Sequence, residues 1–285
     1  MADGDAPRVP LYLRFRRHVQ LAAAFLLNAR FLIDLRGVCF PALNCWACPT
    51  AGVACPLGAL QNSMPALRVS LLAPLYILGS MLAASALIGR AMCGWLCPFG
   101  LVQDLLARVR KRHWRLPRWA GYSKYVMLLG LALIIPYLTW EPWFCKLCPQ
   151  GALQGSIFQP IVRPELREAL GGWWALKIGI LVAFLISFVL VRRPFCHAFC
   201  PLGAIFSLCN RVSLIRMHYD RERCTDCMWC VRECPAGIDP RRDLGSNLCV
   251  SCMECAKCPF GAIRVTTALA RPPVSSDSGA EEAGQ

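Results

Sequence analysis

The 285-residue chain is 56% hydrophobic, has a mean hydropathy of +0.44 and carries only 17% charged residues, whereas soluble domains carry about 25%. This composition excludes an ordinary soluble enzyme and indicates a membrane protein. The formal net charge of +14 would suit a nucleic-acid binder, but the basic residues cluster beside apolar runs, as orientation signals do. The 19 cysteines stand in metal-ligand spacings, which favours metal ligation over a disulfide scaffold.

Residues 1–18 form a basic N-terminus, and four apolar segments within residues 19–212 then predict four transmembrane helices. No A-x-A-like site follows the first apolar run, so we expect no cleavable signal peptide. The second segment is uncharged for 21 residues, close to the ~20 that a helix needs to cross ~30 Å of hydrocarbon. The first is interrupted by Asn28, Arg30 and Asp34. The predicted spans are Val19–Leu35, Val69–Gly89, Tyr125–Trp140 and Trp173–Val191.

The loops between these segments predict the orientation. Residues 90–124 hold eight basic side chains, whereas residues 36–68 hold two, and residues 141–172 hold three that three acids balance. By the positive-inside rule, the N-terminus, the loop of residues 90–124 and everything after residue 192 face the cytoplasm. We therefore expect a multi-pass protein of the bacterial inner membrane with both termini in the cytoplasm.

The membrane part repeats itself. CWACP in the first half recurs as CKLCP in the second, GALQ occurs in both, and CGWLCPFG recurs as CHAFCPLG. Two such halves predict a pseudo-twofold bundle in which ligands from both halves converge on shared sites. Because a span separates the two cysteine motifs in each half, the motifs are expected on opposite membrane faces.

Two sets of four cysteines result. The inner set, on the cytoplasmic side, is Cys93, Cys97, Cys196 and Cys200. Each of its i,i+4 pairs would place both sulfurs on one helical face, and the proline that follows would end or redirect the turn. The outer set, on the opposite side, is Cys45, Cys48, Cys145 and Cys148. Each set could hold one cubane cluster.

Other roles for these thiols stay open. The inner set could instead be a redox thiol pair or a structural feature, and an oxidising outer compartment would favour a disulfide in the outer set. Cys39 and Cys55 could replace one of the outer ligands or pair with each other. Cys209, in an apolar stretch, is expected to be a buried thiol.

Residues 213–270 predict a small α+β domain that binds iron. Two runs, CTDCMWCVRECP and CVSCMECAKCP, each hold three cysteines two residues apart and a fourth before proline. They resemble the bacterial two-[4Fe–4S] ferredoxin module, in which the fourth cysteine ligates the other cluster. The resemblance implies two ligand sets: Cys224, Cys227, Cys230 with Cys258, and Cys249, Cys252, Cys255 with Cys234.

Two points about this domain stay open. The second run has two residues before its last cysteine where the first has three, which leaves open the geometry of the cluster that Cys258 completes. Paired CxxC units also make zinc ribbons, so zinc is the alternative metal.

With CGWLCPFGLVQDL and RPFCHAFCPLGAI, and with the predicted spans and terminal module, residues from about 14 to 265 resemble the NapH/NosR-type family of membrane polyferredoxins. The resemblance implies a membrane electron-transfer protein, surrounded by lipid, that works between the quinone/quinol pool and redox partner proteins. Those partners would be a cytoplasmic ferredoxin-like donor or a periplasmic acceptor. The N-terminal CFPALNCWACPTAGVACPLGALQ goes beyond the simplest members of the family.

Together these observations predict an all-α membrane domain of four transmembrane helices, a small α+β ferredoxin-like domain and a disordered tail at 271–285. Two [4Fe–4S] clusters are expected in the terminal domain and up to four in the whole chain, with a quinone as a further cofactor. The chain would be an electron-transfer component or a quinol dehydrogenase-like oxidoreductase subunit. Clusters on opposite faces would lie up to ~30 Å apart, which is long for one electron step unless the sites sink into the bundle.

Two other functions remain open from the sequence. One is a metal-handling or maturation factor, in which the clusters reduce the outer thiols or a metal such as copper. The other is a redox sensor. No Gly-rich nucleotide fingerprint, P-loop or Ser/His/Asp constellation is found, so NAD(P), flavin or ATP binding by a recognised motif is not expected, nor is nucleic acid as a partner.

Overall fold

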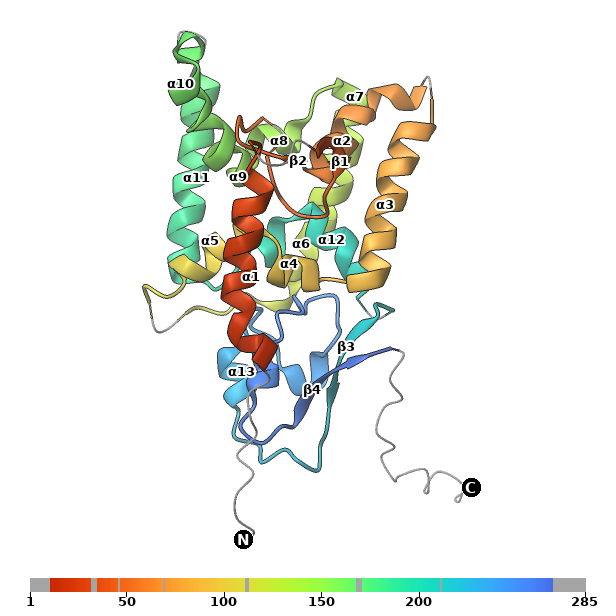
Figure 1. Ribbon diagram of the computed structural model, residues 1–285, viewed down its shortest axis with the longest axis vertical. Coiled ribbons are helices and arrows are strands. Elements are labelled where there is room, and N and C mark those ends of the chain that lie inside the picture. Colours follow the sequence, from red (N-terminus) through yellow and green to blue (C-terminus); the bar gives the residue numbers. More distant parts are fainter. Residues whose placement is uncertain are drawn as a thin grey trace.

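A computed structural model describes residues 11–31, 35–45, 47–68, 70–110, 113–167, 171–210 and 212–268. Figure 1 shows long helices side by side along the longest axis, with the ferredoxin-like strands and loops gathered at one end. The other end carries short helices and a small pair of strands. Residues 1–10 and the tail at 271–285 lie outside the described residues.

Within the described residues, two helical stretches are long and apolar enough to cross a membrane. Residues Arg118–Thr139 have a mean hydropathy of 1.4, and α11 (Gly172–Leu190) has one of 2.2. Only 28% and 11% of their most apolar windows are buried inside the protein, so their side chains face outward, as those of a lipid-facing helix do. The stretch Arg118–Thr139 joins four segments without a break: η2 (Arg118–Tyr122), α6 (Ser123–Val126), η3 (Met127–Ile134) and α7 (Ile135–Thr139).

The other two predicted spans are also helices but differ from the expectation. Helix α3 (Leu72–Ile88) is apolar and shorter than these two. Helix α1 (Leu11–Asn28) begins eight residues before the predicted span, because it takes in the basic residues. Arg16 on this helix is buried, with Nε donating to the carbonyl of Gly94 at 3.1 Å. The four-span topology therefore stays a prediction.

The short helices of this part begin where the sequence places proline. Proline suits the first helical position, because its fixed φ matches the helix and the N–H that it lacks would have no partner there. Helices α2, α5, α9 and α12 each start at a proline that follows cysteine. The short segments are α2 (Pro56–Ser63), η1 (Pro65–Arg68), α4 (Ala91–Trp95), α5 (Pro98–Leu106), α8 (Trp143–Leu147), α9 (Pro149–Gly151), η4 (Ala152–Ser156), α10 (Gln159–Val162), η5 (Pro164–Arg167), η6 (Phe195–Phe199) and α12 (Pro201–Leu208).

Two small sheets complete the fold. Strands β1 (Leu35–Cys39) and β2 (Val53–Ala54) pair in parallel near α2. Strands β3 (Ile215–Tyr219) and β4 (Ile263–Thr267) are antiparallel and bracket the ferredoxin-like residues. Between them lie α13 (Trp229–Glu233), α14 (Pro240–Asp243) and η7 (Glu254–Lys257), which give the small α+β arrangement that the sequence predicts.

One carboxylate ties α1, α5 and the residues after α11 together. Asp104 on α5 bonds Arg193 at 2.6 Å and Arg16 at 2.7 Å, and Arg193 is fully buried. Burial would raise the pKa of Asp104, but the Arg193 and Arg16 guanidiniums outweigh it and lower the pKa to about 2. Arg16 also pairs with Glu254, so the same cluster joins the helices to the terminal domain.

Replacing Asp104 by asparagine should destabilise the protein strongly, because Arg193 would remain charged and buried without its counter-ion. Removing one partner of a buried pair costs about 3–5 kcal/mol. The matched control is Asp243→Asn, whose partner Arg118 is 72% exposed and whose loss should cost about 0–1 kcal/mol. Thermal unfolding in detergent measures both, and equal midpoints for the two variants would contradict this account of Asp104.

Candidate metal centres

Four cysteines occupy the same local structure. Each precedes a helix that begins with proline, and each is followed two residues after that proline by glycine: Cys55, Cys97, Cys148 and Cys200. The first N–H groups of a helix have no partner within it. In these motifs such N–H groups point at the cysteine sulfur. For example, the N–H of Gly203 donates to Cys200 Sγ at 3.3 Å. Burial raises the pKa of Cys97, and the backbone amide of Gly100 opposes it.

Close packing requires the glycine of the CPxG motif at Gly100. A Cβ there would lie 2.9 Å from the carbonyl oxygen of Cys93, and a Cβ on Gly203 would lie 3.3 Å from the Arg90 guanidinium. At Gly100 any larger residue would push the helix start away from its cysteine pair. The motif is therefore a compact unit that holds one sulfur against backbone donors.

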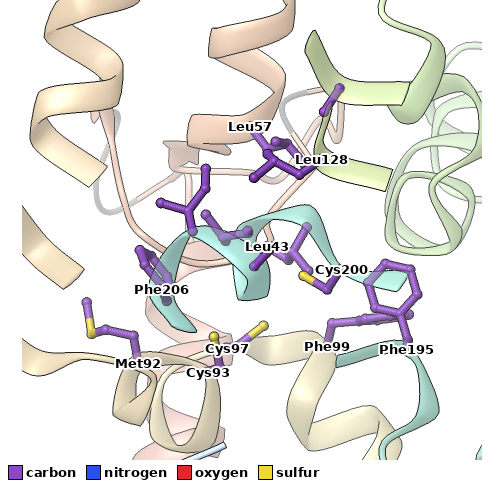
Figure 2. Close-up of a cluster of buried hydrophobic side chains, with 14 of the residues drawn as sticks. Leu43, Leu57, Met92, Cys93, Cys97, Phe99, Leu128, Phe195, Cys200 and Phe206 are labelled. Carbon is purple, nitrogen blue, oxygen red and sulfur yellow. The ribbon is translucent and has the colours of Figure 1, made fainter. Parts of the chain in front are cut away.

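The structure brings the four cysteines of the inner set together. They are buried and line one small cavity between α4, α5, η6 and α12. In Figure 2 the sulfurs of Cys93, Cys97 and Cys200 are turned toward a common space beneath Leu43. Cys93 and Cys97 do not share one helical face, contrary to the prediction, because α4 ends at Trp95 and Pro98 starts a new helix.

The surroundings of the inner set suit a negatively charged group. Burial raises the pKa of Cys93 to about 12 and that of Cys196 to about 11, yet the Arg90 guanidinium is buried beside these thiols. Arg90 donates to the carbonyl of Cys196 at 2.8 Å, and Lys124 donates to that of Asn247. Among the described residues Arg90 has no carboxylate partner, and buried charge requires compensation. Thiolates on an iron–sulfur cluster would supply it, since a metal-bound thiol is deprotonated.

The terminal domain forms its second predicted set directly. Cys234, Cys249, Cys252 and Cys255 line one cavity, so Cys234 lies beside the cysteines of the second run, where the predicted crossover requires it. Of the first set, Cys230 lies near Cys258: burial raises the pKa of Cys230, and the charges of Asp239 and then of Cys258 raise it further. Cys224 is partly exposed and Cys227 is exposed at the surface.

Both cysteine loops adopt the same conformation. The residues just before and just after the middle cysteine have positive φ in each run: Asp226 and Met228 in the first, Ser251 and Met253 in the second. The second run is one residue shorter than the first, and a different type of helical turn accommodates this difference. Where the first run has an α-helical turn, the second has the 3₁₀ turn η7, which is more tightly wound.

The cysteine sets fit clusters better than single zinc ions. Zinc would draw four sulfurs to about 2.3 Å from one point. In the described part of the chain, no three His, Cys, Asp or Glu side chains come close enough together to hold one ion. A cubane lies between its four sulfurs, so a set that surrounds a small volume suits it.

The structure groups the outer cysteines differently from the predicted outer set. A cavity of about 310 Å³ is lined by Cys45, Cys55, Cys145 and Cys148, and Cys48 is not among its lining residues. Cys48 Sγ lies instead 3.0 Å from the hydroxyl of Thr50. The sequence holds the signal for this exchange, because CPLGALQ at Cys55 matches CPQGALQ at Cys148, whereas Cys48 is followed by PTA without the glycine.

Two further cysteines were singled out from the sequence. Cys209 lies at the end of α12 and is only partly buried, so the prediction of a buried thiol is wrong. The side chain of Cys39 lies outside the described residues, and its role stays open.

The inner set and the second ferredoxin set are neighbours. A Cβ on Gly94, next to Cys93, would lie 2.9 Å from the Cα of Cys252. Arg90 bonds the carbonyl of Cys196 with one nitrogen and that of Cys249, at 3.2 Å, with the other. One buried core contains Cys93, Cys97, Cys200 and Cys249 together.

A larger cavity, of about 890 Å³, lies between α1, α5 and the terminal domain. Cys234 lines it on the inside, and the exposed apolar side chains Leu21, Leu105 and Trp114 line its edge. Basic side chains line much of the rest: Arg16, Arg17, Arg108, Arg110, Arg115, Arg192, Arg232 and Lys257.

Comparison with known proteins identifies the chemistry. A family model described as a 4Fe-4S binding domain matches residues 70–117, 124–166 and 172–220, and another with the same description matches residues 217–238. The methylamine utilization ferredoxin-type protein MauN of Methylorubrum extorquens is 30% identical over 219 residues, covering 68% of this chain and 69% of MauN. The chain belongs to the NapH/NosR-type family of membrane polyferredoxins.

Two further relatives show how far this membership extends. Ferredoxin-type protein NapH of Haemophilus influenzae is 26% identical over 182 residues, or 59% of this chain and 58% of NapH. Regulatory protein NosR of Pseudomonas aeruginosa is 32% identical over 209 residues, or 65% of this chain and 27% of NosR. No solved structure matches the chain. Membership shows an iron–sulfur protein of the ferredoxin electron-transfer type, and the activities of the longer relatives are not carried over.

Replacing Gly100 by alanine should remove one cluster. Its Cβ would meet the carbonyl of Cys93 at 2.9 Å, so the Cys93–Cys97 pair would be displaced and about four irons per chain lost. The control is Gly79→Ala on α3, where nothing lies within 4 Å of the new Cβ. Iron and acid-labile sulfide in anaerobically purified protein measure the effect. Full iron content in Gly100→Ala would contradict this account of the motif.

Proposed function

We propose that this polyferredoxin passes single electrons along a row of [4Fe–4S] clusters, between the quinone/quinol pool and a redox partner protein. The observation that carries the proposal is the direct contact between the inner set and the second ferredoxin set, at Gly94 and Arg90. The clusters supply the one-electron chemistry when bound, and the protein sets their spacing, burial and hydrogen bonding.

The proposed row begins in the terminal domain. Its first ligand set is Cys224, Cys227, Cys230 and Cys258, and its second is Cys234, Cys249, Cys252 and Cys255. Burial raises the pKa of Cys255, and the thiols of its own set and of Cys230 raise it further, which supports closeness of the two sets. The third site is the inner set, reached through Arg90.

The proposed entry for quinol is the cavity of about 890 Å³. Leu105 and Trp114 on its edge are 60% and 63% exposed, as suits residues that face lipid tails and an apolar ring system. Its inner end reaches Cys234, a proposed ligand of the second cluster. A quinol oxidised there gives up two electrons and two protons, so two successive one-electron steps along the row are needed for each quinol.

The proposed topology is a multi-pass protein of the bacterial inner membrane with both termini and the terminal domain in the cytoplasm. The basic loop of residues 90–124 supports this orientation. The cytoplasm is also the compartment in which thiols remain reduced. Electrons from quinol would leave at the end of the molecule away from the terminal domain, toward a periplasmic acceptor. Electrons from a cytoplasmic ferredoxin-like donor would instead flow toward the quinone.

Quinol should reduce the clusters of the protein in lipid nanodiscs, and Leu105→Trp should slow this reduction because the larger side chain narrows the cavity edge. Chemical reduction by dithionite should stay unchanged. Leu87→Trp is the matched control, since Leu87 is likewise exposed, at 53%, but lies on α3 away from the cavity. Loss of visible cluster absorption measures both reactions.

Each result of this experiment decides something. No quinol-driven reduction of the wild type would reject the quinone proposal and favour a redox sensor or a metal-handling factor. Equal slowing by both tryptophan variants would place quinol entry elsewhere.

A further inference from the structure

The end of the molecule away from the terminal domain contains a second group of thiols, which differs by one cysteine from the outer set that the sequence predicts. Cys45, Cys55, Cys145 and Cys148 surround a cavity of about 310 Å³. Two glycines lie against the sulfurs, since a Cβ on Gly155 would be in van der Waals contact with Cys45 Sγ at 3.5 Å and one on Gly58 with Cys145 Sγ at 3.6 Å. The cavity wall is thus close to sulfur at both places.

The backbone donors of this group repeat those of the inner set. Cys55 and Cys148 both stand before proline at a helix start and are buried. The backbone amides of Gly58 and Gly151 donate to the Cys55 and Cys148 sulfurs. Two cysteines at helix starts and two more from preceding segments make up the group, as in the inner set.

A cation from a membrane helix faces the same cavity. Lys177 lies in α11, one of the two helices apolar enough to cross a membrane, and it lines the cavity with the four thiols. Among the described residues it has no carboxylate within ion-pair distance. A charged side chain within such a helix is costly and calls for a partner. Four thiolates on a cluster would be that partner, because Lys177 lies near enough to act on both Cys45 and Cys145.

We propose that Cys45, Cys55, Cys145 and Cys148 bind a further [4Fe–4S] cluster, with Lys177 as its counter-ion and the loop of residues 41–45 as the link to the inner set. The proposal rests on the function proposed above and extends its row by one site. Cys48 is not a ligand in this assignment.

The link is short because one loop reaches both sites. Leu43 lines the cavity of the inner set and also that of the outer group. Its backbone amide acts on the Cys97 thiol, and the amide of the next residue, Asn44, acts on the Cys55 thiol. Successive Cα atoms lie about 3.8 Å apart. One peptide unit therefore separates the donors of the two sites, far less than the thickness of a membrane.

A buried amide network fixes this loop. The N–H of Cys45 donates to Gln154 Oε1 at 2.7 Å, Gln154 Nε2 donates to Asn44 Oδ1 at 2.9 Å, and Asn44 Nδ2 donates to the carbonyl of Leu27 at 3.0 Å. The bonds connect α1, the loop and η4. The loop is thus held in one position, as a fixed path between two redox sites requires.

The step between the sites balances as a single electron transfer. One electron leaves the inner site, which is oxidised by one electron, and enters the outer site, which is reduced by one. No covalent bond forms or breaks and no proton is needed. The reductant for the row is the quinol or the reduced ferredoxin-type partner of the proposed function.

The test is metal analysis with EPR on the full chain, purified anaerobically in detergent, for the wild type, Cys55→Ala and Cys48→Ala. We expect about sixteen irons in the wild type, a loss of about four in Cys55→Ala and none in Cys48→Ala. The EPR signals of the terminal domain should persist in both variants, which shows that each has folded.

The contrary outcomes are distinct. Loss of four irons in Cys48→Ala alone would overturn the ligand assignment. About twelve irons in the wild type, unchanged in both variants, would reject the outer cluster, favour a disulfide or thiol pair, and leave the proposed function standing. A wild type without cubane signals would reject the proposed function itself.

A second measurement does not depend on removing a ligand. Lys177→Met should shift the midpoint potential of one cluster to a more negative value, because loss of a nearby cation disfavours the reduced form, and should leave the ferredoxin signals unmoved. The magnetic interaction of that cluster with its neighbour should disappear in Cys93→Ala. An unshifted potential in Lys177→Met would reject the role of the lysine.

Discussion

The fold depends on keeping thiolate charge inside an apolar bundle. A buried thiol resists ionisation, and burial raises the pKa of Cys93 to about 12. The chain offsets this in two ways: the CPxG motif directs free amides of a helix start at sulfur, and the buried Arg90 guanidinium has no carboxylate partner among the described residues. Both features require the short helices and the breaks between them, so the interrupted architecture follows from the chemistry of the sites.

The same constraint explains where the sites lie. Long uninterrupted helices would hold the two ends of the molecule a full membrane thickness apart. Here α4, α5 and α12 stand at mid-height in Figure 1, beneath the loop that follows β1. Leu43 on that loop lines both cavities. The wide gap implied by cysteines on opposite faces is thus reduced by a loop that enters the bundle from one end.

Much of the candidate site could be predicted from the sequence, because the spacing of the cysteines along the chain reflects how they surround a metal. The inner set and the crossover of Cys234 required no knowledge of the fold. Cys55, which the sequence leaves as an alternative outer ligand, lines the outer cavity where Cys48 does not, because the unit that the fold repeats is CPxG at a helix start rather than CxxCP. The position of Cys93 relative to Cys97 depends on where helix α4 ends, and the fit of the shorter second run depends on the 3₁₀ turn η7. The spacing of the cysteines alone shows neither feature.

Basic side chains lie at both buried sites of the membrane part. Arg90 lines the cavity of the inner set and Arg193 lies near its thiols, whereas Lys146 and Lys177 line the outer cavity. Asp104 pairs with Arg193 and Glu141 pairs with Lys146, which leaves Arg90 to act on the inner site and Lys177 on the outer one. Net local charge is one of the terms that set a cluster potential, and hydrogen bonds to sulfur and burial are others. Because each proposed site keeps one such cation, burial and the amides directed at sulfur decide on which of the two an electron rests.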